Sequence, residues 1–121
     1  IKKIHDLVEG YSKQGLMLYR HTAEIERHIR DFFVCKDGSK IVGCGGLKVW
    51  DKKSCEIYAL AVKEKYVGKG IGKGLVNICV KEAKNLKMPF VFTLTFRGDV
   101  FEKLGFKRIN IKSLPCFLIL Q

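Results

Sequence analysis

Four glycines alternate with other residues directly before a helical pattern: Gly68, Gly70, Gly72 and Gly74. Glycine is costly to order, so such a run indicates a local reason. A glycine-rich turn between a strand and a helix N-terminus suits an anion, because the first helical turn has unpaired N–H groups and a partial positive charge. Lys69 and Lys73 add positive charge. The run therefore predicts a phosphate or pyrophosphate site at residues 68–73, with a purely structural turn as the alternative.

Two common nucleotide-binding motifs do not match this run. A P-loop needs GxxxxGK[ST], but neither Gly68 nor Gly70 has a glycine five residues later. The dinucleotide motif GxGxxG fails as well, because Lys73 and Leu75 occupy the positions of its last glycine. The remaining glycine, Gly74, falls inside the first helical turns, where we expect close helix packing. A phosphate-rich small molecule of another class is the open candidate.

The elements that must position this loop follow from hydrophobic periodicity. Helical spacing is present in four segments: 1–14, 22–32, 71–87 (ended by Met88–Pro89) and about 98–104 (ended by Gly105). Strand patterns occupy six segments: 32–36, 40–50, 54–62, 90–95, 106–111 and 116–120. The glycines at 43, 45 and 46 indicate a bulge or a close backbone approach within the second strand.

The connections between these segments predict the sheet. Segments 40–50 and 54–62 are joined by a short turn, which predicts an antiparallel hairpin. Strand 54–62, helix 71–87 and strand 90–95 form one β-α-β unit, which makes its two strands parallel. The fold class is therefore α/β (α+β mixed), with helices covering a largely antiparallel sheet.

Composition sets the remaining limits. The 121 residues fit one domain, 1–121, and carry 23 Lys and Arg against 12 Asp and Glu, a formal net charge of +11. This excess fits a solvated surface, a polyanionic ligand or nucleic acid. The lysines are spread along the whole chain rather than along a stripe, so we expect no nucleic acid. No apolar stretch approaches the roughly 18–20 residues of a bilayer span and no signal peptide is evident, so we expect no membrane.

The five cysteines lie mostly among apolar neighbours: Cys35, Cys44, Cys55, Cys79 and Cys116. None forms a CxxC pair and none has the spacing of a zinc site, so we expect no metal. They are interpreted as small buried hydrophobes in a reducing compartment, with the cytoplasm as the expected location.

Two motifs resemble those of the GCN5-related N-acetyltransferase (GNAT) family. LAVKEKYVGKGIGKGLV, residues 60–76, is similar to its strand, Y-[RV]-G-x-G-I-G-x-x-L loop and helix. FEKLGFKRI, residues 101–109, is similar to its E-K-L-G-F segment. The resemblance implies the acyl-CoA N-acyltransferase fold, with the parallel strands 54–62 and 90–95 splayed apart. The family's usual first strand has no counterpart ahead of the first helix. Val67 stands where the family usually has Arg or Gln.

The resemblance implies acetyl-CoA as co-substrate. The loop amides would hold its pyrophosphate: Gly68, Lys69, Gly70, Ile71, Gly72 and Lys73. The pantetheine arm would pair with the backbone of Leu60, Ala61 and Val62. Phe101 stands where many members carry a tyrosine general acid. Phe101 is expected to pack against CoA. The departing thiolate would then take its proton from Tyr58 or from water, or would leave unassisted.

Strict alternation would put Glu56, Tyr58, Leu60 and Val62 on one face of strand 54–62. Glu56 resembles the glutamate that many family members use as a base, often through water. A carboxylate simply paired with one of the 23 cations is the alternative. By family analogy the Val62 N–H would be the oxyanion donor.

Two further stretches, residues 14–26 and 92–115, resemble N-acetylglutamate synthases of arginine biosynthesis. Arg20 and Arg97 match arginines of those motifs, and bidentate guanidinium pairing suits the two carboxylates of glutamate. Lys48 could add a cation. His21 replaces the usual serine, so a related amino acid is also possible.

L-glutamate is therefore the first expectation for the acceptor. The alternatives are another small amine or a protein amine, or a non-catalytic CoA-binding module. A homodimer is possible, as in many family members.

Overall fold

The computed structural model describes residues 2–13, 22–95, 98–110 and 116–120. Four α-helices and six strands lie in these ranges, with two short 3-10 turns. In chain order they are α1 (Lys2–Lys13), α2 (Thr22–Arg27), η1 (Ile29–Asp31), β1 (Phe32–Asp37), β2 (Lys40–Val49), β3 (Ser54–Val62), η2 (Glu64–Tyr66), α3 (Ile71–Asn85), β4 (Phe90–Thr95), α4 (Gly98–Glu102), β5 (Lys107–Asn110) and β6 (Cys116–Leu120). This confirms the predicted order of elements.

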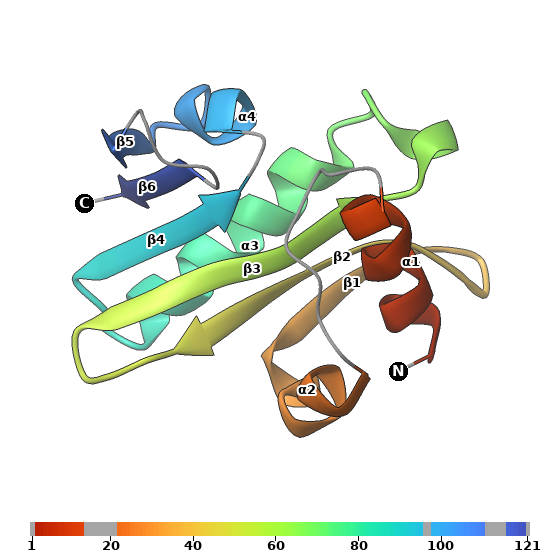
Figure 1. The fold of residues 1–121 in the computed structure, drawn as a ribbon, viewed down its shortest axis with the longest axis horizontal. Coiled ribbons are helices and arrows are strands. Elements are labelled where there is room, and N and C mark those ends of the chain that lie inside the picture. Colours follow the sequence, from red (N-terminus) through yellow and green to blue (C-terminus); the bar gives the residue numbers. More distant parts are fainter. Residues whose placement is uncertain (1, 14–21, 96–97, 111–115, 121) are drawn as a thin grey trace.

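The strands form one sheet in the order β1-β2-β3-β4-β6-β5 (Figure 1). The pair β3 and β4 is parallel, and the other neighbouring pairs are antiparallel. The predicted mixed sheet with one parallel pair is therefore confirmed. The pair is parallel because α3 connects its two strands across one face of the sheet, and it lies at the centre of the strand order (Figure 1).

Helices cover both faces of the sheet, and each face has its own hydrophobic cluster. Under α3 the buried residues are Leu47, Cys55, Ile57, Val76, Cys79, Ala83, Val91, Phe101, Phe106 and Leu118. Under α1 and α2 they are Ile4, Val8, Ile25, Cys44, Tyr58, Ala59 and Ala61. Apolar residues of the helices predicted from 3.6-residue spacing thus bury apolar area against the sheet, the main stabilising term of the fold.

The cysteines whose side chains are described bear out most of the interpretation of buried hydrophobes. Cys44, Cys55 and Cys79 are fully buried, whereas Cys35 is half-buried. Burial raises the pKa of the Cys44 and Cys79 thiols to about 12 and that of Cys55 to about 11. These three thiols are therefore protonated near neutrality and poor nucleophiles.

Three helices end earlier than their sequence patterns predicted: α2, α3 and α4, the last of them at Glu102. α2 stops at Arg27 and continues as the 3-10 turn η1, in which Asp31 N–H bonds to His28 O at 2.8 Å. α3 stops at Asn85, because Lys87 adopts a left-handed φ of 58° and its neighbours close a Schellman-type cap. In that cap Met88 N–H bonds to the Ala83 carbonyl at 3.0 Å. Within the described residues, no helix is long and apolar enough to cross a membrane.

The glycines of β2 allow two close approaches, as predicted. A Cβ on Gly43 would lie 2.9 Å from Ile71 Cγ2, under the start of α3. A Cβ on Gly46 would lie 2.7 Å from Cε1 of the Tyr58 ring, on the opposite face. Both distances are below any real Cβ contact, so only glycine fits the present packing at these positions.

Candidate active site

The two central parallel strands separate halfway along their length. They pair from Ser54 with Phe90 to Ile57 with Thr93, and Thr93 Oγ1 donates a hydrogen bond to the Ile57 carbonyl at 2.8 Å. Beyond Ile57 the described residues of β3 and β4 have no further paired positions. The predicted splay of strands 54–62 and 90–95 is therefore confirmed.

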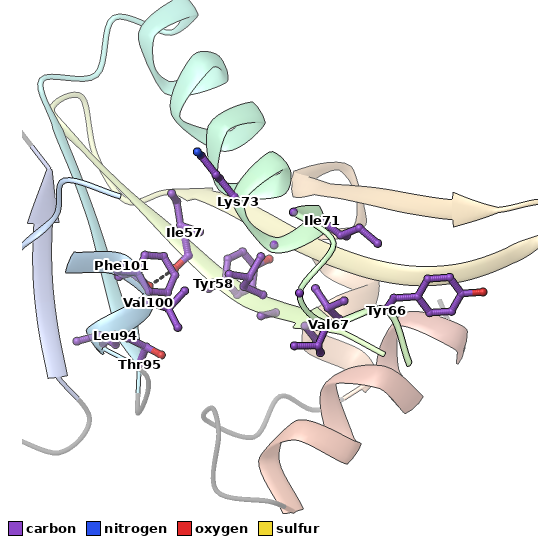
Figure 2. A pocket seen from close by; sticks show the side chains of 18 residues that line it. Ile57, Tyr58, Tyr66, Val67, Ile71, Lys73, Leu94, Thr95, Val100 and Phe101 are labelled. Atoms are coloured by element: carbon purple, nitrogen blue, oxygen red, sulfur yellow. Dashed lines mark hydrogen bonds between the residues drawn. The ribbon is translucent and has the colours of Figure 1, made fainter. Parts of the chain in front are cut away.

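A cavity of about 270 Å³ begins where the strands separate. It is lined by residues of β3, the glycine loop, the start of α3, the end of β4 and α4: 57–62, 66–68, 70–73, 93–95, 100 and 101. In Figure 2, Leu94, Thr95, Val100 and Phe101 lie on one side of it, and Val67 and Ile71 on the other, with Ile57 and Tyr58 between. An extended ligand could thus run along the β3 backbone, which has lost its β4 partner there.

A bulge in β3 corrects the predicted alternation. Ala59 has a φ of 54°, and the register with β2 shifts so that Ala59 and Leu60 together oppose Gly45. Tyr58 consequently packs with the α1 and α2 cluster, whereas Leu60 packs with the α3 cluster. Val62 lies on the same face as Leu60, because its Cγ2 would lie 3.8 Å from a Cβ on Gly72 of α3. The prediction that Glu56, Tyr58, Leu60 and Val62 share one face was wrong, since it assumed an uninterrupted strand.

The glycine run ends in an uncapped helix N-terminus beside the cavity. Gly68 and Gly70 have φ values of 86° and 83°, a left-handed region that favours glycine. Gly70 is the N-cap of α3 and has no side-chain cap, and the first helical hydrogen bond runs from Gly74 N–H to Gly70 O at 2.9 Å. The amides of the three preceding helical residues are therefore outside the helical pattern: Ile71, Gly72 and Lys73. All three line the cavity, so the helix directs partial positive charge there.

Two residues of the predicted loop behave differently from expectation. Lys69 does not line the cavity, and its Nζ lies 5.2 Å from the centre of the Tyr66 ring. A Cβ on Gly74 would meet no heavy atom within 4 Å, so close helix packing does not explain this glycine. Tyr66 itself donates a hydrogen bond to Asp37 Oδ2 at 2.5 Å, which raises its pKa and ties the loop to the end of β1.

A polar cluster lies on the α1 and α2 side of β3. Glu56 is 2% exposed, and its Oε1 accepts a hydrogen bond from Trp50 Nε1 at 3.0 Å. Lys48 lies opposite Glu56 in the β2–β3 ladder, with its Nζ 4.6 Å from the centre of the Tyr58 ring and 5.4 Å from that of Trp50. Tyr58 donates from its hydroxyl to Asp31 Oδ2 at 3.3 Å. Three residues predicted from sequence, Glu56, Tyr58 and Lys48, are therefore brought together.

These predicted residues differ in their relation to the cavity. Tyr58 lines it, whereas Glu56 and Lys48 do not, so Glu56 could reach a reacting group there only through an intermediary such as water. Phe101 lines the cavity, is 3% exposed and packs edge-on against Phe106 with ring centres 5.3 Å apart, as a packing residue would. Arg20 and Arg97 lie outside the described residues.

Trp50 and Asp31 were missed by the sequence reasoning. Trp50 directly follows β2, but its contact with Glu56 depends on the geometry of the turn at residues 51–53. Asp31 lies in η1, a segment predicted as helix. The only signal in the sequence was that Trp50 is the single tryptophan of the chain. Among the described residues, no group of three or more His, Cys, Asp or Glu side chains could hold a metal ion.

Comparison with known proteins assigns the family. Residues 2–106 match the model of the acetyltransferase (GNAT) family. An uncharacterized N-acetyltransferase of Chlorobaculum tepidum is 36% identical over 112 residues, which cover 93% of this chain and 72% of the relative. The chain therefore belongs to the GNAT family of N-acetyltransferases, and the predicted family and fold are confirmed.

Two further comparisons concern Mycobacterium tuberculosis. An amino-acid acetyltransferase is 30% identical over 113 residues, covering 91% of this chain and 64% of the relative, slightly under two thirds of its length. A protein solved in complex with CoA and NLQ superposes with a TM-score of 0.81 at 31% identity, covering 88% of this chain and 66% of the other. The resemblance to amino-acid acetyltransferases thus extends over most of the chain.

Proposed function

We propose that this chain transfers the acetyl group of acetyl-CoA to the α-amine of an amino acid, with L-glutamate as the first choice. The observation that carries the proposal is the cavity at the separation of β3 and β4, closed at one end by the uncapped N-terminus of α3. Acetyl-CoA would supply an acetyl group activated as a thioester. The similarity to a CoA complex supports acetyl-CoA as the donor, and the similarity to an amino-acid acetyltransferase supports an amino acid as the acceptor.

The residues that line the cavity fit an extended, phosphate-bearing ligand. The backbone of Gly68 and of residues 70–73, all of which line the cavity, would hold the pyrophosphate, because the amides at the start of α3 are outside the helical pattern and carry its positive end. The glycines leave that backbone open, and a Cβ at Gly68 or Gly70 would meet no protein atom within 4 Å. The backbone of Leu60, Ala61 and Val62 would pair with the pantetheine arm, since β4 no longer occupies that edge.

The acceptor amine would enter from the α1 and α2 side, where the polar cluster lies. Glu56 would take the amine proton through a water molecule, since it is buried and outside the cavity wall. The Val62 N–H would stabilise the charge that develops on the carbonyl oxygen. Tyr58 donates its hydroxyl hydrogen to Asp31, so it would have to turn away from Asp31 before protonating a departing thiolate. Water is therefore the better candidate for that proton.

The glutamate assignment depends on cations that would pair with its carboxylates. Lys48 lies beside Tyr58 without lining the cavity itself, and Arg20 and Arg97 are predicted from sequence motifs to complete the site. The cytoplasmic location, the organisation of residues 1–121 as one domain and the homodimer remain predictions. So do the alternatives of a different acceptor amine and of a CoA-binding module without turnover.

An acceptor panel tests the proposal directly. The protein is incubated with acetyl-CoA and, separately, glutamate, aspartate, glutamine, a polyamine or a lysine peptide, and thiol release is followed with mass spectrometry of the product. We expect N-acetylglutamate to form fastest. Acetylation of polyamines without any amino acid would refute the acceptor class. Calorimetric binding of CoA without turnover of any amine would favour the binding module.

A further inference from the structure

Trp50 combines high exposure with a buried hydrogen-bond partner. Trp50 is the residue directly after β2. It is 59% exposed, an unusual state for a large aromatic residue. Its indole N–H nevertheless reaches Oε1 of Glu56, a carboxylate that is only 2% exposed, at 3.0 Å. The indole thus lies between solvent and the carboxylate at the entrance to the polar cluster.

We propose that Trp50 is a positioning residue that orients the Glu56 carboxylate for proton transfer. The inference rests on the proposed role of Glu56 as the base. A bond to one oxygen restricts rotation of the carboxylate, which fixes the direction of the second oxygen. Orientation comes first for a general base, because its geometry decides whether it can reach the proton.

The effects of other groups near Glu56 must be distinguished from the effect of the indole N–H. Lys48 lies opposite Glu56 on β2, Tyr58 lies two residues along β3, and Asp31 accepts the Tyr58 hydroxyl from η1. Lys48 Nζ also lies 5.4 Å from the centre of the Trp50 ring, close enough for a cation–π contact. A change at Trp50 that deletes the whole ring would therefore disturb Lys48 as well. The test must remove the N–H and keep the ring.

The single tryptophan of the chain permits such a change. In a tryptophan auxotroph, Trp50 is replaced by β-(3-benzothienyl)alanine, in which sulfur occupies the place of the N–H. The matched control carries 5-fluorotryptophan, which keeps the N–H. Trp50→Phe provides a second variant without the hydrogen bond. Melting temperatures of all proteins are measured so that any loss of folding is recorded separately.

We expect the benzothienyl protein and Trp50→Phe to show kcat/KM for the acceptor about tenfold lower across the whole pH–rate profile, because the carboxylate is no longer held in one orientation. The KM for acetyl-CoA should stay unchanged. The 5-fluorotryptophan protein should match the unmodified one. A benzothienyl protein whose profile coincides with that control, at equal melting temperature, would overturn the positioning role.

The failure of the proposed function gives a different result. A profile unaltered in Glu56→Gln removes Glu56 as base, and absence of turnover with every amine removes the acetyltransfer itself. In both cases the positioning role is overturned together with the function on which it rests. Normal turnover that depends on Glu56 but not on the indole N–H overturns the Trp50 inference alone. The assay uses whichever amine the acceptor panel identifies.

Discussion

Substituting alanine at Gly46 and at Gly43 should separate the two substrates of the enzyme. The two glycines lie three residues apart on β2, and their missing side chains make room on opposite faces of the sheet. A Cβ on Gly46 would lie 2.7, 3.1 and 3.2 Å from three atoms of the Tyr58 ring. A Cβ on Gly43 would meet Ile71 and Leu75, which belong to α3.

The size of the Gly46 effect follows from these distances. The Tyr58 ring must move by about 0.7 Å to reach an ordinary contact of 3.4 Å. A planar ring moves as one body, and Phe32 packs on it with ring centres 5.3 Å apart. Overpacking of this kind costs about 1–3 kcal/mol, a fall in Tm of roughly 4–12 °C for a domain of this size. Because displacements near 1 Å can cost about 100-fold in rate, we expect kcat/KM for the acceptor to fall about 10- to 100-fold.

Steady-state kinetics with each substrate varied in turn provides the assay. Gly46→Ala should lower kcat/KM for the acceptor and leave the KM for acetyl-CoA within about twofold of its original value, since α3 is untouched. Gly43→Ala should instead raise the KM for acetyl-CoA, because it pushes on Ile71 at the helix N-terminus. Thermal melting of both variants corrects for lost folded protein. If the two variants impair the same substrate, the assignment of one substrate to each face is wrong.

Three further outcomes are expected. Arg97→Ala should raise the KM for the acceptor at least tenfold and leave that for acetyl-CoA unchanged, since a lost bidentate carboxylate pair affects one substrate; equal effects would assign Arg97 to the other ligand. Glu56→Gln should lower kcat about 100-fold and abolish the acidic limb of the pH–rate profile, measured by thiol release; an unchanged limb contradicts its role as base. Asp51 accepts from the amides of Lys53 and Ser54, both at 2.8 Å, and the first of these bonds does most to lower its pKa. The stabilising effect of these bonds is therefore complete above the unfolded pKa near 4 and lost as pH falls through the lower folded pKa. Asp51→Ala should thus lower Tm at pH 7 and lower it less as the pH falls below about 4, and an equal loss throughout would refute the linkage.

Local signals explain why much of the fold could be predicted. The glycine run, the helix that follows it and the neighbouring strands are each encoded within a short window, by spacing and by residues with special backbone preferences. The start of α3 at Ile71 and the left-handed Gly68 and Gly70 belong to this class. The end of α3 does not, because Lys87 adopts a left-handed conformation for which its sequence has no glycine or asparagine signal.

The polar cluster could be predicted only in part, since its contacts join distant segments. Glu56, Tyr58 and Lys48 were found from strand positions and family motifs. The hydrogen bond from Trp50 depends on how the hairpin turns, and the bond to Asp31 depends on where α2 gives way to η1. Neither depends on periodicity. Sequence reasoning therefore found the residues on the strand and missed those that reach them from loops.

The bulge at Ala59 explains how one strand can serve two substrates. Without it, Tyr58 and Leu60 would lie on the same face, and the residues nearest the cavity would all point either toward α3 or away from it. The left-handed φ of 54° at Ala59 costs on the order of 1–3 kcal/mol in a residue with a side chain, so the surrounding structure must compensate for it. Its effect is to place Tyr58 among the α1 and α2 residues and Leu60 among the α3 residues within three positions. In the proposed function, that inversion lets the acceptor and the CoA arm approach the same short stretch of backbone from opposite sides of the sheet.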